Sequence, residues 1–186
     1  MSLPKLYVDS NGNTPDFPKP YRTMESKIKR EQRKLSRKEK GSKNYEKQRI
    51  KLAKQHAKAK HLRNDVLHKL SCALTDRYDL IAIEDLDMSA IKRSLRFGKS
   101  ASDNGWGMFT DMLSYKAKRK GKQLVKVDRW FPSSKTCSHC GHIHKELRLS
   151  DRIYLCPKCG HTMDRDQQAA QNIVKEAKRM LLNAAF

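Results

Sequence analysis

The chain has 186 residues, of which 37% are hydrophobic and 33% are charged, so it can build one domain core from which some elements project. Its 41 Lys and Arg residues against 20 Asp and Glu residues give a formal net charge of +21, which predicts a polyanionic partner. No apolar run approaches the roughly twenty residues of a membrane-spanning helix, and no secretory signal pattern opens the sequence. Nucleic acid is therefore the favoured partner, and a membrane is not expected.

The first predicted elements are a short strand and a turn. Residues 5–8 have the composition of a strand. The run Asp9-Ser10-Asn11-Gly12-Asn13 predicts a tight turn after it, because Asn-Gly tolerates positive φ. Prolines at positions 15, 18 and 20 then predict an extended linker.

Two helices are expected next, as an antiparallel hairpin over residues 23–77. The first begins with Thr23 as its N-cap and ends at residue 39 or 40. After a break at residues 41–44, the second runs from about Tyr45 to Arg77. Its apolar residues recur every seven positions, which predicts a narrow coiled-coil seam. The seam consists of Tyr45, Leu52, Ala59, Val66 and Ala73, with Leu62, Leu70 and Leu74 alongside.

The hairpin is strongly basic. Between residues 22 and 69 there are eighteen Lys and Arg residues and five Asp and Glu residues. A charge run is most often a solvated face, but so one-sided a run favours contact with phosphates. The candidate nucleic-acid-binding residues are Lys27, Arg30, Arg33, Lys34, Arg37, Lys38, Arg49 and, outside the hairpin, Lys135.

The second half of the chain alternates strands and helices. A buried strand is predicted over residues 78–86, followed by a polar loop to residue 104, a helix at 105–119 and a strand at 123–128. A cysteine-rich segment at 133–163 and a helix at 166–182 complete the chain. This order predicts an α/β layer.

The cysteine-rich segment predicts a structural zinc site. Cys137 and Cys140 form one C-x-x-C pair, and Cys156 and Cys159 form a second pair fifteen residues later, a spacing typical of a closed four-thiolate zinc ribbon. The alternatives are a redox dithiol and plain buried cysteines. The neighbouring His139, His142, His144 and His161 could replace a thiolate, but four cysteines suffice.

Three acidic residues are candidates for chemistry. Glu84 closes the strand at 78–86, and Asp164 and Asp166 precede the last helix. Clustered carboxylates hold the two Mg²⁺ ions of phosphodiester hydrolysis, although an acidic residue at a helix start is more often a cap.

Three motifs in order give the chain a resemblance to a known family. They are Ile81-Ala82-Ile83-Glu84-Asp85-Leu86, Asp128-Arg129-Trp130-Phe131-Pro132-Ser133-Ser134-Lys135-Thr136-Cys137 and Asp164-Arg165-Asp166-Gln167-Gln168-Ala169-Ala170-Gln171-Asn172-Ile173. The series resembles the transposon-encoded TnpB/OrfB family, which is related to the type V CRISPR effectors.

The resemblance implies a RuvC-type nuclease of RNase H-like fold, with a zinc ribbon inserted before the last catalytic motif. It also implies an RNA-guided DNA endonuclease whose partners are DNA and a guide RNA. Glu84 and Asp166 match the second and third catalytic, Mg²⁺-binding carboxylates of the family. The position of Gln168 is usually Asn in the family, a mild departure.

The same resemblance places the first catalytic aspartate before Met1, about ten residues ahead of the turn at Ser10-Asn11-Gly12. We therefore expect a core truncated at its first strand and unable to cleave alone, unless Asp9, Asp16 or a partner chain supplies the third ligand. The unprotected sheet edge that results could pair in a dimer.

The expected organisation is a partial RuvC core at 5–132 including the hairpin, a zinc ribbon at 133–163, and the last RuvC motif with the C-terminal helix at 164–186. We expect a prokaryotic, cytoplasmic protein associated with the nucleoid. A non-catalytic zinc-ribbon module that binds DNA or RNA, and an adaptor that regulates a longer protein, remain alternatives. For Trp106 and Trp130, core packing is favoured over base stacking.

Overall fold

In the computed structural model of the chain, residues 5–90, 105–148 and 150–184 are described. Their elements are α1 (Pro20–Ser36), α2 (Lys43–Arg77), β1 (Leu80–Glu84), α5 (Trp106–Arg119), β2 (Gln123–Val127), β3 (Ile153–Leu155), β4 (Thr162–Asp164) and α6 (Arg165–Ala184). The predicted strand at 123–128 and helix at 105–119 are confirmed, and most of the loop predicted up to residue 104 lies outside the described residues.

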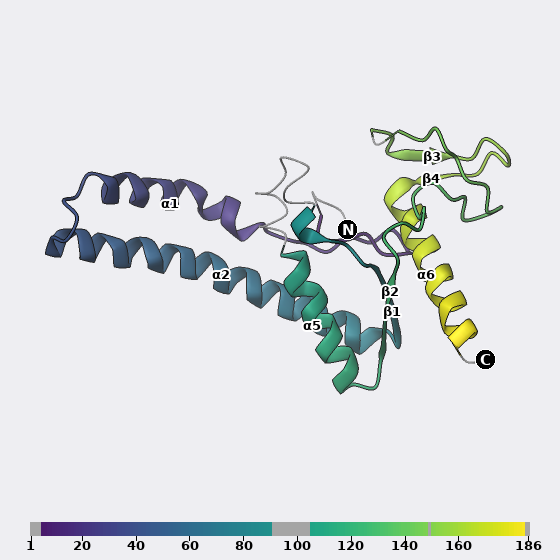
Figure 1. Cartoon of the computed structure of the whole chain (residues 1–186), viewed down its shortest axis with the longest axis horizontal. Coiled ribbons are helices and arrows are strands. Elements are labelled where there is room, and N and C mark those ends of the chain that lie inside the picture. Colours follow the sequence, from purple (N-terminus) through teal and green to yellow (C-terminus); the bar gives the residue numbers. More distant parts are fainter. Residues whose placement is uncertain (1–4, 91–104, 149, 185–186) are drawn as a thin grey trace.

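The centre of the molecule is a parallel pair of strands between two helical layers (Figure 1). β1 and β2 pair from Leu80 opposite Gln123 to Glu84 opposite Val127, and α5 makes the crossover between them. Helices α2 and α5 pack together on one side, and α6 contacts both strands. This is the mixed α/β layer that the alternation of elements predicts.

Side chains alternate across β1, so each face of the strand pair has its own core. Ile81 and Ile83 join Leu67 and Phe109 in the cluster beneath α2 and α5. Ala82 points the other way and packs with the cluster of Val127, Ile173 and Ala177 from β2 and α6. Alternate residues of a strand share a face, so Glu84, two positions after Ala82, also lies on the α6 side of the strands.

The basic hairpin extends away from this core (Figure 1). Helix α1 packs against the first half of α2 through a small cluster of Met24, Ile28 and Ala59. The predicted boundaries of α1 are wrong: it begins at Pro20, because proline has its φ preset for the first turn, and it ends at Ser36. Thr23 is not the N-cap, since its hydroxyl donates to the carbonyls of Pro18 and Lys19.

The coiled-coil seam of α2 holds only over its first half. Ala59 is buried, but Ala73 is exposed, and Leu62 is 44% exposed. A straight helix drifts by about 20° per heptad, so the buried stripe moves from the predicted positions to Leu67, Ser71 and Thr75. Both polar side chains in this stripe bond to carbonyls one turn earlier, which satisfies their hydroxyl donors.

Residues 5–8 do not form the predicted strand; within the described residues they join no ladder. Burial holds this segment instead: Leu6 is fully buried in the central core, and Tyr7 stacks on Phe109 with ring centroids 5.7 Å apart. The turn that follows is as predicted, with Gly12 at a φ of 85°. None of the helices within the described ranges combines the length and apolarity needed to cross a bilayer.

Candidate functional site

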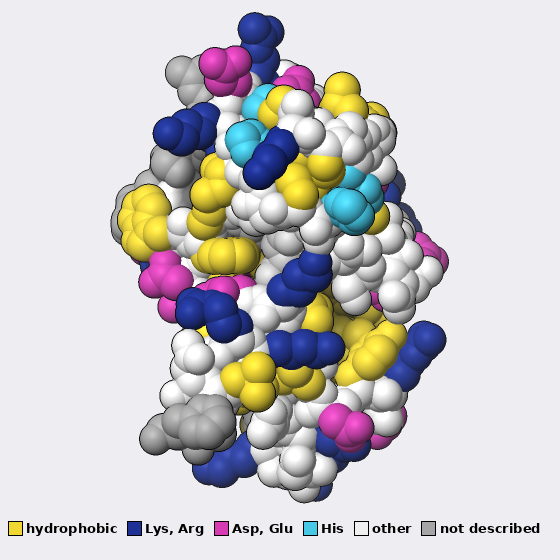
Figure 2. All heavy atoms as spheres, turned by 90° about the vertical axis from the view of Figure 1, so that its right-hand side faces the viewer, with side chains coloured by type: hydrophobic (Ala, Val, Ile, Leu, Met, Phe, Trp, Pro, Cys, Tyr) yellow, Lys and Arg dark blue, Asp and Glu magenta, His cyan; other side chains and the backbone are white. Residues whose placement is uncertain are grey.

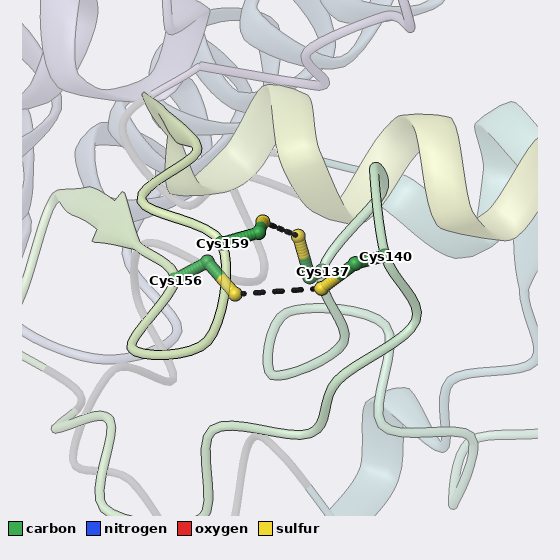
Figure 3. Close-up of side chains that lie close together, drawn as sticks. All are labelled: Cys137, Cys140, Cys156 and Cys159. Atoms are coloured by element: carbon green, nitrogen blue, oxygen red, sulfur yellow. Dashed lines mark hydrogen bonds between the residues drawn. The ribbon is translucent and has the colours of Figure 1, made fainter.

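The four paired cysteines converge from two loops on one point (Figure 3). Their sulfur atoms all lie within 4.8 Å of one another. The Sγ atoms of Cys137 and Cys159 are 3.7 Å apart, and those of Cys140 and Cys156 are 3.6 Å apart. Four sulfurs at about 2.3 Å from a tetrahedral Zn²⁺ are about 3.8 Å from each other, so the cluster has the dimensions of a four-thiolate zinc site.

The two C-x-x-C turns have the same backbone hydrogen bonds. Each begins with a cysteine whose N–H donates to the carbonyl five residues later, in Cys137 to His142 and in Cys156 to His161, at 2.8 and 2.9 Å. The glycine after each second cysteine donates its N–H back to the first cysteine, and both glycines have φ near 70°, where a Cβ would be strained. The repeated geometry explains why both pairs point their thiols inward.

The thiols of this cluster differ in pKa. Although burial acts in the opposite direction, the backbone N–H groups of Cys159 and Lys158 lower the pKa of Cys156 to about 6. Although the N–H of His161 acts to lower it, burial and the neighbouring thiols raise the pKa of Cys159 to about 12. A bound dication removes this conflict, because it allows all four sulfurs to be thiolates.

The cysteine-rich segment forms a small module whose antiparallel strands β3 and β4 pair from Ile153 opposite Asp164 to Leu155 opposite Thr162. Tyr154 is fully buried against Cys137 and Cys156, and forms most of the module's small core. Figure 2 views this end of the molecule and shows Lys and Arg spread over the face, with His gathered on the module.

A row of polar side chains on α6 holds the module in place. Gln168, fully buried, accepts from the hydroxyl of Ser138 at 2.8 Å and donates to the carbonyl of Thr136 at 2.8 Å. One turn later, Asn172 donates to the carbonyls of Ser133 and Thr136 at 2.8 and 2.6 Å. The sequence analysis did not identify this role; the available signal was a pair of amides spaced i, i+4 beside the apolar positions of the helix.

The carboxylates of interest come together at the edge of the strand pair. Glu84 and Asp166 line one hollow of about 230 Å³, together with Ser133, Lys135, Arg148 and Arg165. We call it the carboxylate hollow. Glu84 is half-buried, and its Oε1 accepts a hydrogen bond of 2.9 Å from the Ser133 hydroxyl. The two acids are 82 positions apart in the sequence numbering.

Local structure fixes the direction of each acid. The pleat of β1 places Glu84 on the α6 face, and the ladder with Val127 fixes its backbone. Asp164 caps α6: its Oδ1 accepts from the N–H groups of Asp166 and Gln167 at 2.9 and 3.0 Å. Asp164 thus has the cap role that acidic residues often have at helix starts, whereas the carboxylate of Asp166 lines the hollow.

The charge around the hollow is positive. Lys135, a candidate nucleic-acid-binding residue, donates to the carbonyl of Lys145 at 2.9 Å, and Arg165 donates to the carbonyl of Arg148 at 3.2 Å. Asp9, considered above as a substitute third ligand, has a different part in the structure: its Oδ1 accepts from the N–H groups of Asn11 and Asn13 at 2.9 and 2.8 Å. It closes the N-terminal turn.

The other nominated basic residues lie on the hairpin. Lys27, Arg33, Arg37 and Lys38 are exposed. Arg30 and Lys34 pair with the buried Glu31, and Arg49 pairs with Glu46 at 2.8 Å. The exposed Arg49–Glu46 pair is weak, so Arg49 can exchange its carboxylate for a phosphate at low cost.

The two tryptophans differ. Trp106 is 5% exposed in the central core, as expected, where it lies tilted against Phe109. The expectation of core packing is wrong for Trp130, which is 85% exposed. Its neighbour Phe131 fills the space against Val127 and Ile173 instead.

Comparison with protein-family models gives two matches that together cover most of the chain. Residues 1–95 match a family described as "Probable transposase" (OrfB_IS605). Residues 106–173 match a family described as "Cas12f1-like, TNB domain". The second match contains the four-cysteine module.

Among curated proteins, a "Putative RNA-guided DNA endonuclease" of Streptomyces pristinaespiralis is 40% identical over 172 residues, covering 92% of this chain and 42% of that protein. InsQ of Escherichia coli K12, with the same description, is 32% identical over 192 residues, covering 95% of this chain and 48% of that protein. The chain therefore spans less than half the length of these relatives.

Among solved structures, the fold resembles part of Cas12f1 in its complex with sgRNA and target DNA. The TM-score is 0.59 with 19% sequence identity, over 87% of this chain and 43% of that one. A second Cas12f ternary complex gives a TM-score of 0.56 with 20% identity. At these identities the likeness concerns the fold.

Proposed function

Because this chain belongs to the OrfB (TnpB) family of probable transposases, we propose that it provides the cleavage site and a zinc-binding nucleic-acid module of an RNA-guided DNA endonuclease. The observation that carries the proposal is the carboxylate hollow, which Glu84 and Asp166 both line together with Lys135, Arg148 and Arg165. Relatives named as RNA-guided DNA endonucleases support the assignment of DNA and a guide RNA as partners.

The core that we assign to this activity is RNase H-like, of the RuvC type. The parallel β1–β2 pair with its α5 crossover, flanked on the other face by α6, supports this assignment. In it, residues 5–132 and 164–186 form the core, and residues 133–163 form the inserted zinc ribbon. Within the described residues β1 pairs with β2 alone, so its other edge could accept a further strand or a second copy.

The chemistry that we assign is metal-dependent hydrolysis of a phosphodiester. Glu84 and Asp166 would hold Mg²⁺, which typically takes one or two carboxylates and completes its shell with water and substrate phosphate. When bound, Mg²⁺ would stabilise the charge that develops on the phosphate oxygens. The hollow has the oxygen donors that this ion requires.

The side chains of the chain itself hold and orient the reacting groups. The Ser133 hydroxyl fixes one oxygen of Glu84, and the Asp164 cap fixes the first turn of α6, which carries Asp166. Lys135 and Arg148, which also line the hollow, would bind phosphates of the substrate strand. Helix α6 contributes through Asn172, which holds Ser133 by its carbonyl.

The test is cleavage of a plasmid and of labelled single-stranded DNA with Mg²⁺ or Mn²⁺, together with calorimetric titration of Mn²⁺ into the zinc-loaded chain. We expect Glu84→Gln and Asp166→Asn each to weaken Mn²⁺ binding and abolish any cleavage. Asp111→Asn, which neutralises an exposed acid on α5, should change neither.

Cleavage that survives Glu84→Gln would refute the assignment of the site. Nucleic-acid binding without cleavage, and without Mn²⁺ binding that depends on Glu84, would instead identify a non-catalytic zinc-ribbon binding module.

A further inference from the structure

Trp130 is an unusual surface residue. At 85% exposure it is the most exposed of the large hydrophobic side chains in the described part of the chain. An indole has a large apolar area, so leaving it in water forgoes the stabilisation that burial would give. A solvent-exposed tryptophan therefore calls for a ligand that covers it.

The turn that displays this indole is fixed on both sides. Asp128 accepts the N–H of Trp130 on its Oδ1 at 2.7 Å, and accepts the N–H of Phe131 on its carbonyl at 3.1 Å. Phe131 packs into the core between the strands and α6. Ser133, 5% exposed, donates to Glu84. The side chain thus projects from an ordered turn that is tied to the carboxylate hollow.

We propose that Trp130 is a stacking platform for an unpaired base of the nucleic-acid strand that enters the carboxylate hollow. Three residues of chain span at most about 11 Å, so the backbone of Trp130 lies within that distance of Ser133, which bonds to Glu84. At about 3.4 Å per nucleotide, this reach corresponds to at most about three nucleotides of a bound strand. The identity of the ligand rests on the proposed function.

The indole of Trp130 favours a base over a phosphate as the group it contacts, because it carries no charge and presents a flat π-face. Lys126 and Arg129 lie 3.8 and 3.7 Å from the carboxylate of Asp85, and Arg129 also lies 3.9 Å from Asp87. These exposed pairs are weak, so the two cations can hold the phosphates that flank a base stacked on the indole. Stacking on such a face tolerates every base, because every base has a π-face.

The chain contains two tryptophans, and Trp106 is 5% exposed, so the red-shifted, solvent-exposed part of the intrinsic emission reports on Trp130. We would titrate a fifteen-nucleotide oligo-dT strand into the zinc-loaded 186-residue chain without added Mg²⁺. The expected result is quenching of the solvent-exposed emission. Trp130→Ala should weaken binding roughly 5- to 150-fold, the gain that one stacked base provides, and Trp130→Phe should restore most of it.

Leu182→Ala is the matched control, since Leu182 is 64% exposed near the end of α6; it should leave binding unchanged. Circular dichroism verifies that each variant is folded. Unchanged affinity of Trp130→Ala, or emission that the strand does not alter, would overturn the stacking role. So would emission already shielded in the free chain, which would show that a protein surface covers the indole. Because no divalent metal for cleavage is present, failure of the nuclease assignment leaves this measurement intact.

Discussion

Replacing Asn172 with alanine is expected to loosen the zinc module from α6. The Asn172 amide is 3% exposed and donates to the carbonyls of Ser133 and Thr136. The Thr136 carbonyl keeps its hydrogen bond from Gln168. Losing the bond from Asn172 at that carbonyl therefore costs only the net value of one hydrogen bond, about 1 kcal/mol. The Ser133 carbonyl loses the bond from Asn172, at a cost of about 1–3 kcal/mol for a buried acceptor. The expected destabilisation is therefore about 2–4 kcal/mol.

Urea unfolding followed by circular dichroism measures this change, and release of zinc to a chromogenic chelator reports on the module itself. Asn183→Ala is the matched control, because it removes the same side chain from an exposed position of the same helix; it should change stability by less than about 0.5 kcal/mol. If Asn172→Ala were as mild as this control and zinc release were no faster, the polar row on α6 would not be what holds the module.

Three further predictions follow from other contacts. Removing zinc with a chelator should expose residues 133–163 to limited proteolysis while α1 and α2 remain helical by circular dichroism; an unchanged digestion pattern would contradict a metal-dependent module. The Gln48 amide, and then Lys34, hold the pKa of Glu31 below its ordinary value, so Glu31 stabilises the fold above that ordinary value and ceases to as the pH falls through its folded pKa. The stability difference between wild type and Glu31→Gln should accordingly shrink on acidification, and a difference independent of pH would refute it. Ser133→Ala should reduce metal-dependent cleavage, or Mn²⁺ affinity at the hollow, about 10- to 100-fold with DNA affinity unchanged; an equal loss in DNA affinity would show that Ser133 acts on binding instead.

Sequence patterns predicted the features that depend on local chemistry. The spacing of Cys137, Cys140, Cys156 and Cys159 was sufficient because each C-x-x-C turn is built by its own backbone bonds. The apolar run ending at Glu84 was sufficient for a buried strand, since continuous β-branched segments occur where both faces are covered.

Features that depend on distant partners were not predictable. A strand at residues 5–8 needs a neighbour to pair with, and sequence alone does not show whether one is present. The position of Ala73 depended on whether α2 would supercoil, which a seam with alanine at two of its five positions does not enforce. Gln168 and Asn172 resembled solvent-facing residues of a helix, because their acceptors lie more than 30 positions earlier in the chain.

The overlap of α1 with α2 sets a scale for what the hairpin can touch. The 17 residues of α1 span about 26 Å at about 1.5 Å per residue, whereas α2 around Leu67 already packs into the central core. Figure 1 shows the hairpin reaching outward from the strands. A duplex lying along the hairpin would be followed for about seven base pairs at about 3.4 Å each. Each base pair removed from a bound duplex below that length should therefore lower the number of counterions released on binding.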